Sequence, residues 1–379
     1  MRPSPTPAVR CSLLAFLLLL GSSAAFRAPS GHTRTYYVAA DEVTWDYAPS
    51  GRDQIKGQAF DDVQRPFVEA QAHSVGRVTL KAVYRDYTDS TFATLKPRAA
   101  AWQHLGVLGP VLRAEVGDTI RVVFRNNSRF PVSMHPHGVS YGKDSEGAAY
   151  ADNTETADKN GVPTGGVHVY LWPVPDRAGP ARGDPSSILW MYHSHVHEDQ
   201  DISSGLMGPM IISARGTTRP DGTPKDVDRE FVVAFYEIDE NASRYLPSNI
   251  QTYMKDPAGV HVESVFGVQQ VVPPPDGQFN FKETLNGFLY GNGPMPTMRV
   301  GDRVRWYLMS ATGFEIHSPH WHGNTVEIAH GRTDVAGLLP MGMIVADMVP
   351  DNPGIWLFHC HVSNHLKMGM QMRYEVAAK

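Results

Sequence analysis

The amino-acid sequence predicts an all-β protein built from two β-sandwich domains. The chain has 379 residues, which is too long for one typical domain and suits two, each with its own core. It contains 34 Gly and 29 Pro and lacks long helical periodicity, which favours short strands joined by turns. Segments 119–124 (TIRVVF) and 303–308 (RVRWYL) alternate β-branched or aromatic residues with others, as strands of a half-buried sheet do.

An internal repeat divides the chain. Three motifs occur twice in the same order, as AEVGDTIR at 114–121 and MRVGDRVR at 298–305, HPHG at 135–138 and HWHG at 320–323, and WMYHSH at 190–195 and WLFHCH at 356–361. Between the copies, residues 214–228 are polar, rich in Gly and Pro, and typical of a linker. The repeat predicts domain 1 at 26–215, a linker at 216–228 and domain 2 at 229–379.

The N-terminus has the three parts of a secretory signal peptide. Arg2 and Arg10 precede an apolar run at 13–20, and small residues follow the run at 21–25. The run is far shorter than the ~20 residues that a membrane-spanning helix needs, and no later segment reaches that length. We expect residues 1–25 to be removed and the mature protein to be secreted, extracellular or periplasmic, without a membrane span.

Charge and cysteine content narrow the function. The formal net charge is -5, and removal of the signal peptide would take away two positive charges and make the mature chain more negative. Nothing in this charge indicates a nucleic-acid partner. Cys11 lies in the predicted signal peptide, which leaves Cys360 as the lone thiol of the mature chain. A lone thiol in an oxidising compartment favours a metal-bound thiolate, with a buried inert cysteine as the alternative.

The histidines are paired far more often than chance predicts. Random placement of 17 His gives about one His-x-His pair, whereas the chain has them at 135/137, 193/195, 195/197, 320/322 and 359/361. In a strand, residues two apart share a face, so each pair presents two imidazoles side by side, which suits a metal cluster. We interpret the remaining histidines as ordinary core or surface residues: His32, His73, His104, His168, His197, His261 and His330.

The C-terminal motif is the most specific of these. His359 and His361 flank Cys360, His365 follows the cysteine by five residues, and Met370 follows it by ten. A thiolate, two imidazoles and a weak axial thioether form a blue-copper electron-transfer site, with His317 as the second imidazole. The soft thiolate favours copper over magnesium or calcium.

These motifs resemble those of the multicopper oxidase family, and most closely its ceruloplasmin and hephaestin branch. The likeness covers nearly all of the predicted mature chain and includes TWDYAPS at 44–50, LGPVLRAEVGD at 108–118, HPHGVSYGKDSEGAAYADN at 135–153 and NPGIWLFHCHVSNH at 352–365. It implies two cupredoxin-like (plastocyanin-like) Greek-key β-sandwiches, in a two-domain form that is similar to the family's terminal domains.

The resemblance also implies the cofactor and the ligands. It implies four copper ions per active unit: type 1 at His317, Cys360, His365 and Met370; type 2 at His135 and His320; and type 3 at His137, His193 and His361 and at His195, His322 and His359. Donor electrons would enter one at a time near His365, and Cys360, His359 and His361 would link the type 1 copper to the cluster. The cluster would reduce O₂ to water by four electrons.

Domain 1 lacks the blue-copper ligands. The repeat places Val132, Ser194 and Pro209 where domain 2 has its first histidine, its cysteine and its methionine. The blue site is therefore expected in domain 2 alone, which argues against a copper nitrite reductase. The complete ligand set also argues against the rival class, a non-catalytic structural module like those of the clotting cofactors.

Departures from the family leave the electron donor open. The resemblance places Gln278, Glu283 and Asn364 at an iron site that uses carboxylates and a histidine, and a carboxamide lacks the charge that Fe²⁺ favours. A laccase-like oxidation of phenols or other organic donors therefore stands level with a ferroxidase activity. A cuprous oxidase is a further alternative, because four methionines of domain 2 could bind Cu(I): Met341, Met343, Met368 and Met372. Flexible packing in the core is the other explanation for these methionines.

Other polar residues carry weaker predictions, each with a solvated loop or surface as its alternative. Second-sphere or proton-relay groups are predicted at Asp144 and Glu146, calcium ligands at Asp152, Asp158 and Asn160, and N-x-S sequons at Asn126 and Asn241. Ser187 and Ser213 replace the two cysteines of a disulfide that the resemblance implies in this part of the fold.

The resemblance also implies an assembly. A three-copper cluster needs ligands from both domains, whereas two domains in one chain form at most one interface. Two-domain relatives are ring-shaped homotrimers, with each cluster between domain 1 of one chain and domain 2 of the next. We therefore expect a homotrimer whose other partners are O₂ and a reducing substrate.

Overall fold

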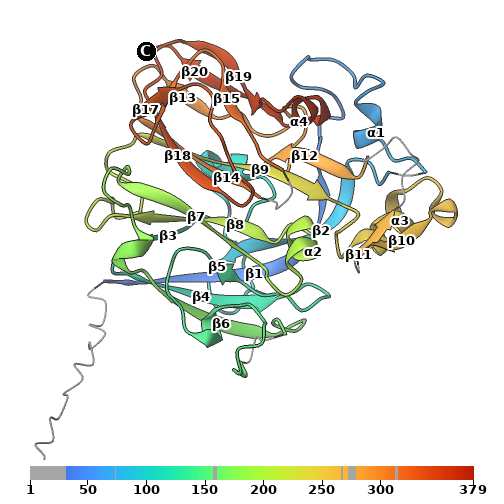
Figure 1. Ribbon diagram of the computed structural model, residues 1–379, viewed down its shortest axis with the longest axis horizontal. Coiled ribbons are helices and arrows are strands. Elements are labelled where there is room, and N and C mark those ends of the chain that lie inside the picture. The colour runs from blue at the N-terminus through green and yellow to red at the C-terminus, as the bar shows by residue number, and fades with distance from the viewer. Residues whose placement is uncertain (1–30, 73, 157–159, 266–267, 272–278, 312–314) are drawn as a thin grey trace, which may run out of the picture.

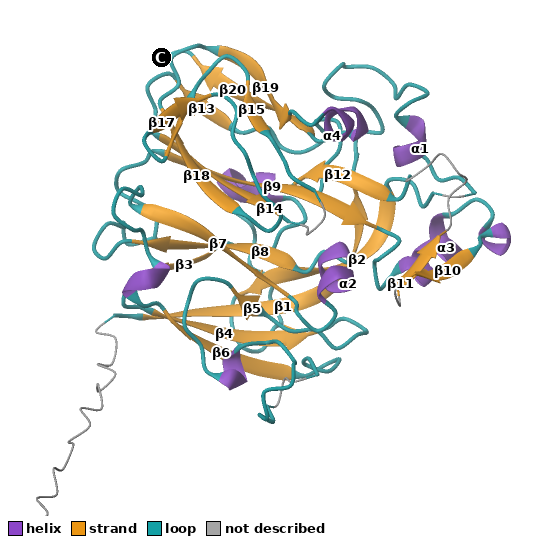
Figure 2. Cartoon of the chain, viewed as in Figure 1, coloured by secondary structure: helices purple, strands orange, loops and turns teal. Residues whose placement is uncertain are grey.

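The computed structural model describes residues 31–379 except 73, 157–159, 266–267, 272–278 and 312–314. The predicted signal peptide, Cys11, His73, Asp158 and Gln278 lie outside the described residues. Within them, strands predominate and four sheets lie in successive layers (Figures 1 and 2). The all-β prediction is confirmed.

Residues 33–213, the N-terminal unit, form a two-sheet sandwich. One sheet has the order β2-β1-β4-β6, with bounds Val78–Tyr87, Thr33–Asp46, Thr119–Asn126 and Val167–Pro173. The other has the order β3-β8-β7-β5, with bounds Leu112–Glu115, Met207–Ser213, Ser187–His193 and His135–Pro136.

Residues 229–377, the C-terminal unit, repeat this arrangement. One sheet has the order β12-β9-β14-β18-β16-β17, with bounds Phe281–Leu285, Arg229–Asp239, Val304–Ser310, Met343–Met348, Val326–Ile328 and Gly331–Thr333. The other has the order β13-β20-β19-β15, with bounds Thr297–Arg299, Gln371–Ala377, Gly354–Cys360 and Pro319–Trp321. The parallel pairs also recur, as β1 with β4 and β9 with β14.

Three hydrophobic cores hold the four layers together. Tyr192 of β7 belongs to the core inside the N-terminal unit, whereas its neighbour Met191 belongs to a core between the two units. On β14, Tyr307 faces that same inter-unit core and Trp306 faces the core inside the C-terminal unit. Because neighbouring residues of a strand point to opposite faces, both middle sheets are covered on two sides.

Burial of the sheet on both faces corrects the expectation that segment 303–308 is half-buried. The strand that forms there, β14, runs from Val304 to Ser310, and all seven of its residues are buried. The reason is that one face of β14 packs inside its own unit and the other packs against the N-terminal unit. A strand buried on both faces reads as a nearly continuous apolar run, as WYLM does here. In β4 the alternation is retained over most of the strand.

Short helices and turns complete the chain. The α-helices are α1 (Arg65–Val68), α2 (Glu198–Ser203), α3 (Leu246–Tyr253) and α4 (Ser363–Met368), and a hairpin pairs β10 (Val262–Val265) with β11 (Val268–Val271). Residues 214–228 contain turns and one bridge, between Thr218 and Pro224. Among the described residues no helix is long and apolar enough to cross a membrane.

Ser187 and Ser213 lie directly opposite each other on β7 and β8, and both are buried. The Ser187 hydroxyl bonds the Tyr307 hydroxyl at 2.7 Å and accepts from the Arg305 guanidinium at 2.8 Å. Arg305 is 2 % exposed and also pairs with Asp347 at 2.7 Å. Polar contacts between the units therefore occupy the place where the resemblance implied a disulfide.

The two sequons are poorly placed for glycosylation. Asn126 is fully buried, and its amide donates to the carbonyl oxygens of Phe130 and Val162 at 2.7 and 2.8 Å. Asn241 is 8 % exposed and its side-chain oxygen accepts from Asn280. A glycan needs a solvent-accessible amide, so the burial of both asparagines argues against their glycosylation in the folded chain.

We predict that His104 makes the stability depend on pH. Its Nδ1 bonds the Ala101 carbonyl and its Nε2 accepts from the Val232 amide, and burial lowers its pKa from 6.5 to about 4. Between these pH values the folded chain binds fewer protons than the unfolded chain, so the contribution is complete above pH 6.5 and is lost as pH falls toward 4. Over that range the loss is about 3 kcal/mol.

The measurement is the free energy of unfolding at pH 7 and pH 4.5, in the same metal state throughout. The variant His104→Gln should lose less stability over this interval than the unmodified chain. His261→Gln, at an exposed histidine, is the matched control and should behave like the unmodified chain. Equal losses in all three proteins would refute the assignment.

Candidate metal centre

Four histidines meet at one end of the β5–β7 pair. The N-terminal histidine set contains His135, His137, His193 and His195. His135 lies directly opposite His193 in the β5–β7 register, so cross-strand pairing brings the two His-x-His motifs together. The Nε2 atoms of His137 and His193 are 3.0 Å apart. A hollow of about 450 Å³ opens over His135, His137 and Tyr141.

The C-terminal histidine set repeats this geometry. It contains His320, His322, His359 and His361. His320 lies opposite His359 in the β15–β19 register, and the Nε2 atoms of His322 and His359 are 3.1 Å apart. In both sets the two strands therefore aim ring nitrogens at a shared point.

Backbone carbonyl groups orient the rings in both sets. Nδ1 of His135 bonds the Glu146 carbonyl at 2.7 Å, and Nδ1 of His320 bonds the Asp334 carbonyl at 2.9 Å. Nδ1 of His359 bonds the Cys360 carbonyl at 2.7 Å. A carbonyl can only accept, so each Nδ1 carries the proton and each Nε2 keeps a free lone pair, which a metal requires.

Burial keeps these imidazoles neutral. Burial, with a smaller contribution from neighbouring histidines, lowers the pKa of His137 and His359 to about 4. Burial also holds the pKa of His193 well below its usual range. Neutral imidazole is the form that binds metals, so these three histidines are prepared as ligands at neutral pH.

The cysteine site contains His317, Cys360 and His365, with Met370 beside them. Cys360 Sγ lies 3.9 Å from Nδ1 of His317 and 3.5 Å from Nδ1 of His365. All four side chains are buried, and the Cys360 amide donates to the Met370 carbonyl. Burial lowers the pKa of His317 to about 3, which leaves its ring neutral. The predicted thiol and imidazoles thus converge on one point.

The repeat extends to the glycine after each first His-x-His motif. Gly138 and Gly323 both have positive φ, at 76° and 72°. A Cβ on Gly138 would lie 2.2 Å from the Trp190 ring, and one on Gly323 would lie 2.5 Å from the Trp356 ring. Only glycine permits this turn and this close approach, so the HxHG and WxxHxH motifs form one packed unit in each half.

The structure does not bring the two histidine sets together within one chain. Among the described residues, no hydrogen bond or ring contact joins a member of one set to a member of the other. The sheets that carry them are the second and fourth layers, and the sheet of β9 and β14 lies between (Figure 1). The predicted pairing of His135 with His320 is therefore absent within a single chain.

The remaining predicted positions have ordinary surroundings. The other described histidines make no contact with the two sets or the cysteine site among the described residues: His32, His104, His168, His197, His261 and His330. Asp144 is exposed, and Glu146 pairs its carboxylate with Lys143 at 2.7 Å. Asp152 also pairs with Lys143, at 2.8 Å, so a lysine already neutralises the predicted calcium ligand.

Three carboxylates near the sites were missed at the sequence level. Glu198 of α2 lies 3.4 Å from Nε2 of His195 and 3.6 Å from Nε2 of His193. Glu315 lies 2.8 Å and Glu237 3.6 Å from Nε2 of His365. An acid three residues after His195 was a local signal for Glu198. Glu237 was detectable only as an acid inside the apolar run of β9.

Glu237, Glu283 and Glu315 form an acidic group at the outer edge of the cysteine site. Burial raises the pKa of Glu283 to about 9, with further contributions from Glu237 and Glu315. Carboxylate oxygens of Glu237 and Glu315 and a nitrogen of His365 lie within 4.8 Å of one another. Asn364, predicted for the same region, is exposed.

The fold and the paired ligand sets define a metalloprotein of cupredoxin type. Family models described as multicopper oxidase match residues 87–217 and 262–379. The chain belongs to the multicopper oxidase family, and its cofactor metal is accordingly copper.

Curated relatives agree with this. The chain is 42% identical to Ferroxidase HEPHL1 of Mus musculus over 373 residues, which is 97% of this chain and 30% of that protein. It is 40% identical to hephaestin of Rattus norvegicus and 38% identical to ceruloplasmin of Homo sapiens, over 96% and 91% of this chain and 31% and 32% of theirs. The chain thus spans about a third of the length of these relatives.

Solved structures support the fold. A multicopper oxidase and the blue copper oxidase from Nitrosomonas europaea both superpose with a TM-score of 0.54 at 16% identity. The first match covers 91% of this chain and 88% of that chain, and the second covers 91% and 86%. The cupredoxin-like prediction for the fold is confirmed.

Proposed function

We propose that this chain is a copper oxidase that couples one-electron oxidation of a donor to four-electron reduction of O₂ to water. One observation carries the proposal. On β19, Cys360 points into the core toward His317 and His365, while its neighbour His359 joins the C-terminal histidine set on the other face. A single strand thus connects a thiol site to a histidine cluster through one peptide unit. When bound, copper supplies electron transfer at the first site and O₂ reduction at the second.

The donor atoms fit copper, and we assign them accordingly. The assignments are type 1 at His317, Cys360, His365 and Met370; type 2 at His135 and His320; and type 3 at His137, His193 and His361 and at His195, His322 and His359. The two closest nitrogen pairs, at 3.0 and 3.1 Å, each fall within one proposed type 3 site. A thiolate with two imidazoles and a thioether selects copper. Four copper ions per active unit follow.

We propose that each three-copper cluster forms between two copies of the chain. The type 2 and type 3 assignments combine members of both histidine sets, which lie in different layers of one chain. Each site would be incomplete without the partner copy. A homotrimeric ring would complete every set by a heterologous contact that closes.

The internal repeat indicates which surfaces would meet. Within the chain, the outer face of β18 contributes Met343 and Val345 to the core between the units. β6 is the repeat equivalent of β18, and its Val167, Val169 and Leu171 are 55%, 38% and 48% exposed. These three residues form an apolar row that has no partner within the described chain.

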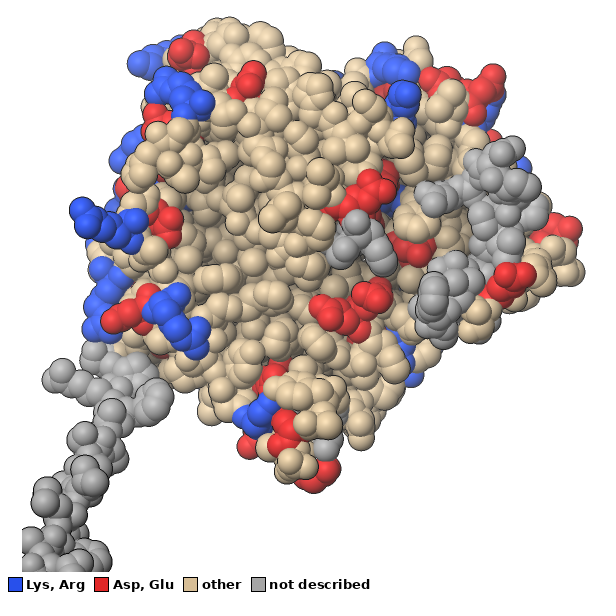
Figure 3. Space-filling view, in the orientation of Figure 1, with Lys and Arg blue, Asp and Glu red and all other residues tan. Residues whose placement is uncertain are grey.

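A matching surface lies on β19. Leu189 and Met191 of β7 are buried in the core between the units, and the repeat places Ile355 and Leu357 of β19 at the same positions. Ile355 is 59% exposed. A second copy could therefore repeat, between chains, the contact that already joins the two units. In the view of Figure 3, few charged side chains lie over β7, β14 and β18.

A divalent metal ion is the electron donor that the structure favours. Glu237 and Glu315 supply oxygen ligands beside His365, where donor electrons would enter. Hard cations such as Fe²⁺ prefer carboxylates, and these acids replace the charge that Gln278 and Asn364 lack. One relative of the chain, HEPHL1 of Mus musculus, is named as a ferroxidase. We therefore place ferroxidase activity ahead of a laccase-like oxidation of organic donors.

Secretion, extracellular or periplasmic, is part of the proposal and rests on the sequence of residues 1–25. The predicted calcium site stays a prediction, because Asp158 lies outside the described residues.

The blue site predicts an absorption band. The copper-loaded chain should absorb strongly near ~600 nm because thiolate-to-copper charge transfer requires Cys360. Cys360→Ser should abolish the band, and His197→Ala, at an exposed histidine outside both sets, should leave it unchanged. An equally intense band in the Cys360→Ser protein would exclude the assignment.

Sharing of the cluster predicts complementation between two inactive variants. His137→Ala removes a ligand from the N-terminal histidine set and His322→Ala removes one from the C-terminal histidine set. Each alone should consume no O₂, whereas proteins co-expressed and assembled together should recover part of the activity at interfaces with two intact sets. Light scattering should give three times the mass of one chain. An active monomer, or no recovery in verified mixed assemblies, would reject the shared cluster.

The acidic group predicts selective effects on the donor. Glu315→Gln keeps a hydrogen-bonding group beside His365 but loses the charge, so the KM for Fe²⁺ should rise roughly tenfold. Oxidation of a phenol should change little. Glu327→Gln, which removes an exposed acid paired with Arg332, is the matched control. Steady-state O₂ consumption with both donors checks this, and equal losses for Fe²⁺ and phenol would argue against a metal-docking role.

A further inference from the structure

A cavity of about 730 Å³ opens at the side of the N-terminal unit, between β1, β2, the 3₁₀ helix η1 (Ala100–Leu105) and β3. None of its lining residues belongs to the histidine sets or the cysteine site. Its volume is in the range of pockets that bind small molecules.

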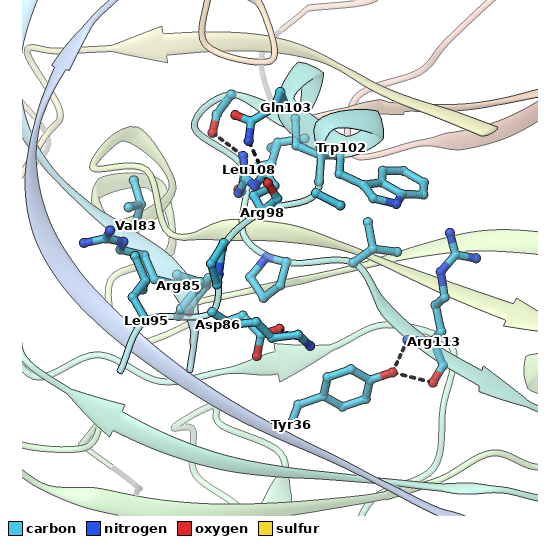
Figure 4. Close-up of a pocket in the computed structure, with 18 of the residues that line it drawn as sticks. Tyr36, Val83, Arg85, Asp86, Leu95, Arg98, Trp102, Gln103, Leu108 and Arg113 are labelled. Carbon is cyan, nitrogen blue, oxygen red and sulfur yellow. Dashed lines mark hydrogen bonds and ion pairs between the residues drawn. The ribbon is translucent and has the colours of Figure 1, made fainter. Parts of the chain in front are cut away.

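Aromatic rings in fixed positions form part of the wall. In Figure 4 the Trp102 ring lies toward the top and the Tyr36 ring toward the bottom, with Arg113 at the right. The Tyr36 hydroxyl donates to the Arg113 carbonyl and accepts from the Arg113 amide, both at 2.8 Å. The Arg113 guanidinium lies 5.2 Å from the centre of the Trp102 ring. The rings are therefore held in place before any ligand arrives.

One cation that lines the cavity has no carboxylate partner in the described part of the chain, and two acids that also line it, Glu115 and Asp221, are bonded to backbone N–H and threonine hydroxyl groups. Four of its cations have carboxylate partners within 4.0 Å: Arg34 with Asp118, Arg85 with Asp41, Lys96 with Asp86 and Arg113 with Glu230. Arg98 has no such partner among the described residues. Its guanidinium donates to the neutral carbonyl groups of Gly106 at 2.8 Å and Leu108 at 2.6 Å.

Those two carbonyl groups position Arg98 without neutralising it. A guanidinium has five N–H donors, and two hydrogen bonds leave three for another acceptor. A charge that is partly withdrawn from water gains most from an anion that can accept more than one hydrogen bond. A carboxylate has this chemistry.

We infer that this cavity binds a planar organic anion, with an aromatic ring against Trp102 and a carboxylate on Arg98. The ring requirement comes from the aromatic and apolar wall, and the charge requirement comes from the cation without a carboxylate partner. The site is separate from the proposed copper chemistry and does not depend on it.

Calorimetric titration of the copper-loaded full chain with 2-naphthoate tests the inference. Its uncharged analogue 2-naphthamide has nearly the same shape and serves as the ligand control. We expect one naphthoate to bind per chain. The amide should bind roughly tenfold more weakly or worse, because it cannot make the charge-assisted hydrogen bond to Arg98. Equal binding of the two compounds, or no binding of naphthoate, would overturn it.

Variants locate the site. Arg98→Gln should weaken naphthoate binding at least roughly tenfold, and Trp102→Leu should weaken naphthoate and naphthamide together. Arg332→Gln, at an exposed arginine elsewhere, should bind like the unmodified chain. Copper content and circular dichroism verify folding. If Arg98→Gln fails to fold, Trp102→Leu and the ligand pair still decide, and unchanged binding in Trp102→Leu would place the ligand elsewhere.

Discussion

The alternation of side chains along one β-strand is the constraint on which the proposed chemistry depends. In β19 the cysteine points inward, where His317 and His365 meet it, and the preceding histidine points outward to its own cluster. Consecutive residues of a strand cannot share a face, so two sites on opposite faces are joined by the shortest covalent path a chain can offer. In a helix, two consecutive residues point only about 100° apart and so do not lie on opposite faces.

The two halves share a layout but have different surroundings. The outer face of β7 is covered by the C-terminal unit, while the equivalent face of β19 leaves Ile355 exposed. The same asymmetry leaves Val167 and Val169 of β6 in solvent, although their equivalents on β18 are packed. When two similar units are joined side by side, each unit leaves one apolar contact surface exposed at its free side. Closure of several chains into a ring would cover both exposed surfaces of every chain.

Features encoded by local spacing were predictable from the sequence, and features created by folding were not. The His-x-His motifs could be recognised because residues two apart share a strand face. The paired imidazoles lie close together in the structure, as do Cys360, His317 and His365, while their assignment as copper ligands stays a prediction. Nothing in the spacing placed Glu237 or Glu315 beside His365, since they come from another strand and a distant loop. The carbonyl acceptors behind the rings carry no side-chain signature, and the burial of Asn126 depends on contacts with Val162.

The N-terminal unit has closed the place of the missing blue site with hydrogen bonds. The Ser194 hydroxyl, at the position of Cys360, donates to buried Asp201 at 2.6 Å, and Asp201 pairs with Arg244 of the C-terminal half at 3.1 Å. This core is complete without an ion, whereas the core around Cys360 contains a thiol and two imidazoles that face one another. Without copper, the N-terminal unit therefore has a hydrogen-bonded core at this position and lacks metal only at its histidine set, whereas the C-terminal unit lacks metal both at its histidine set and inside its core.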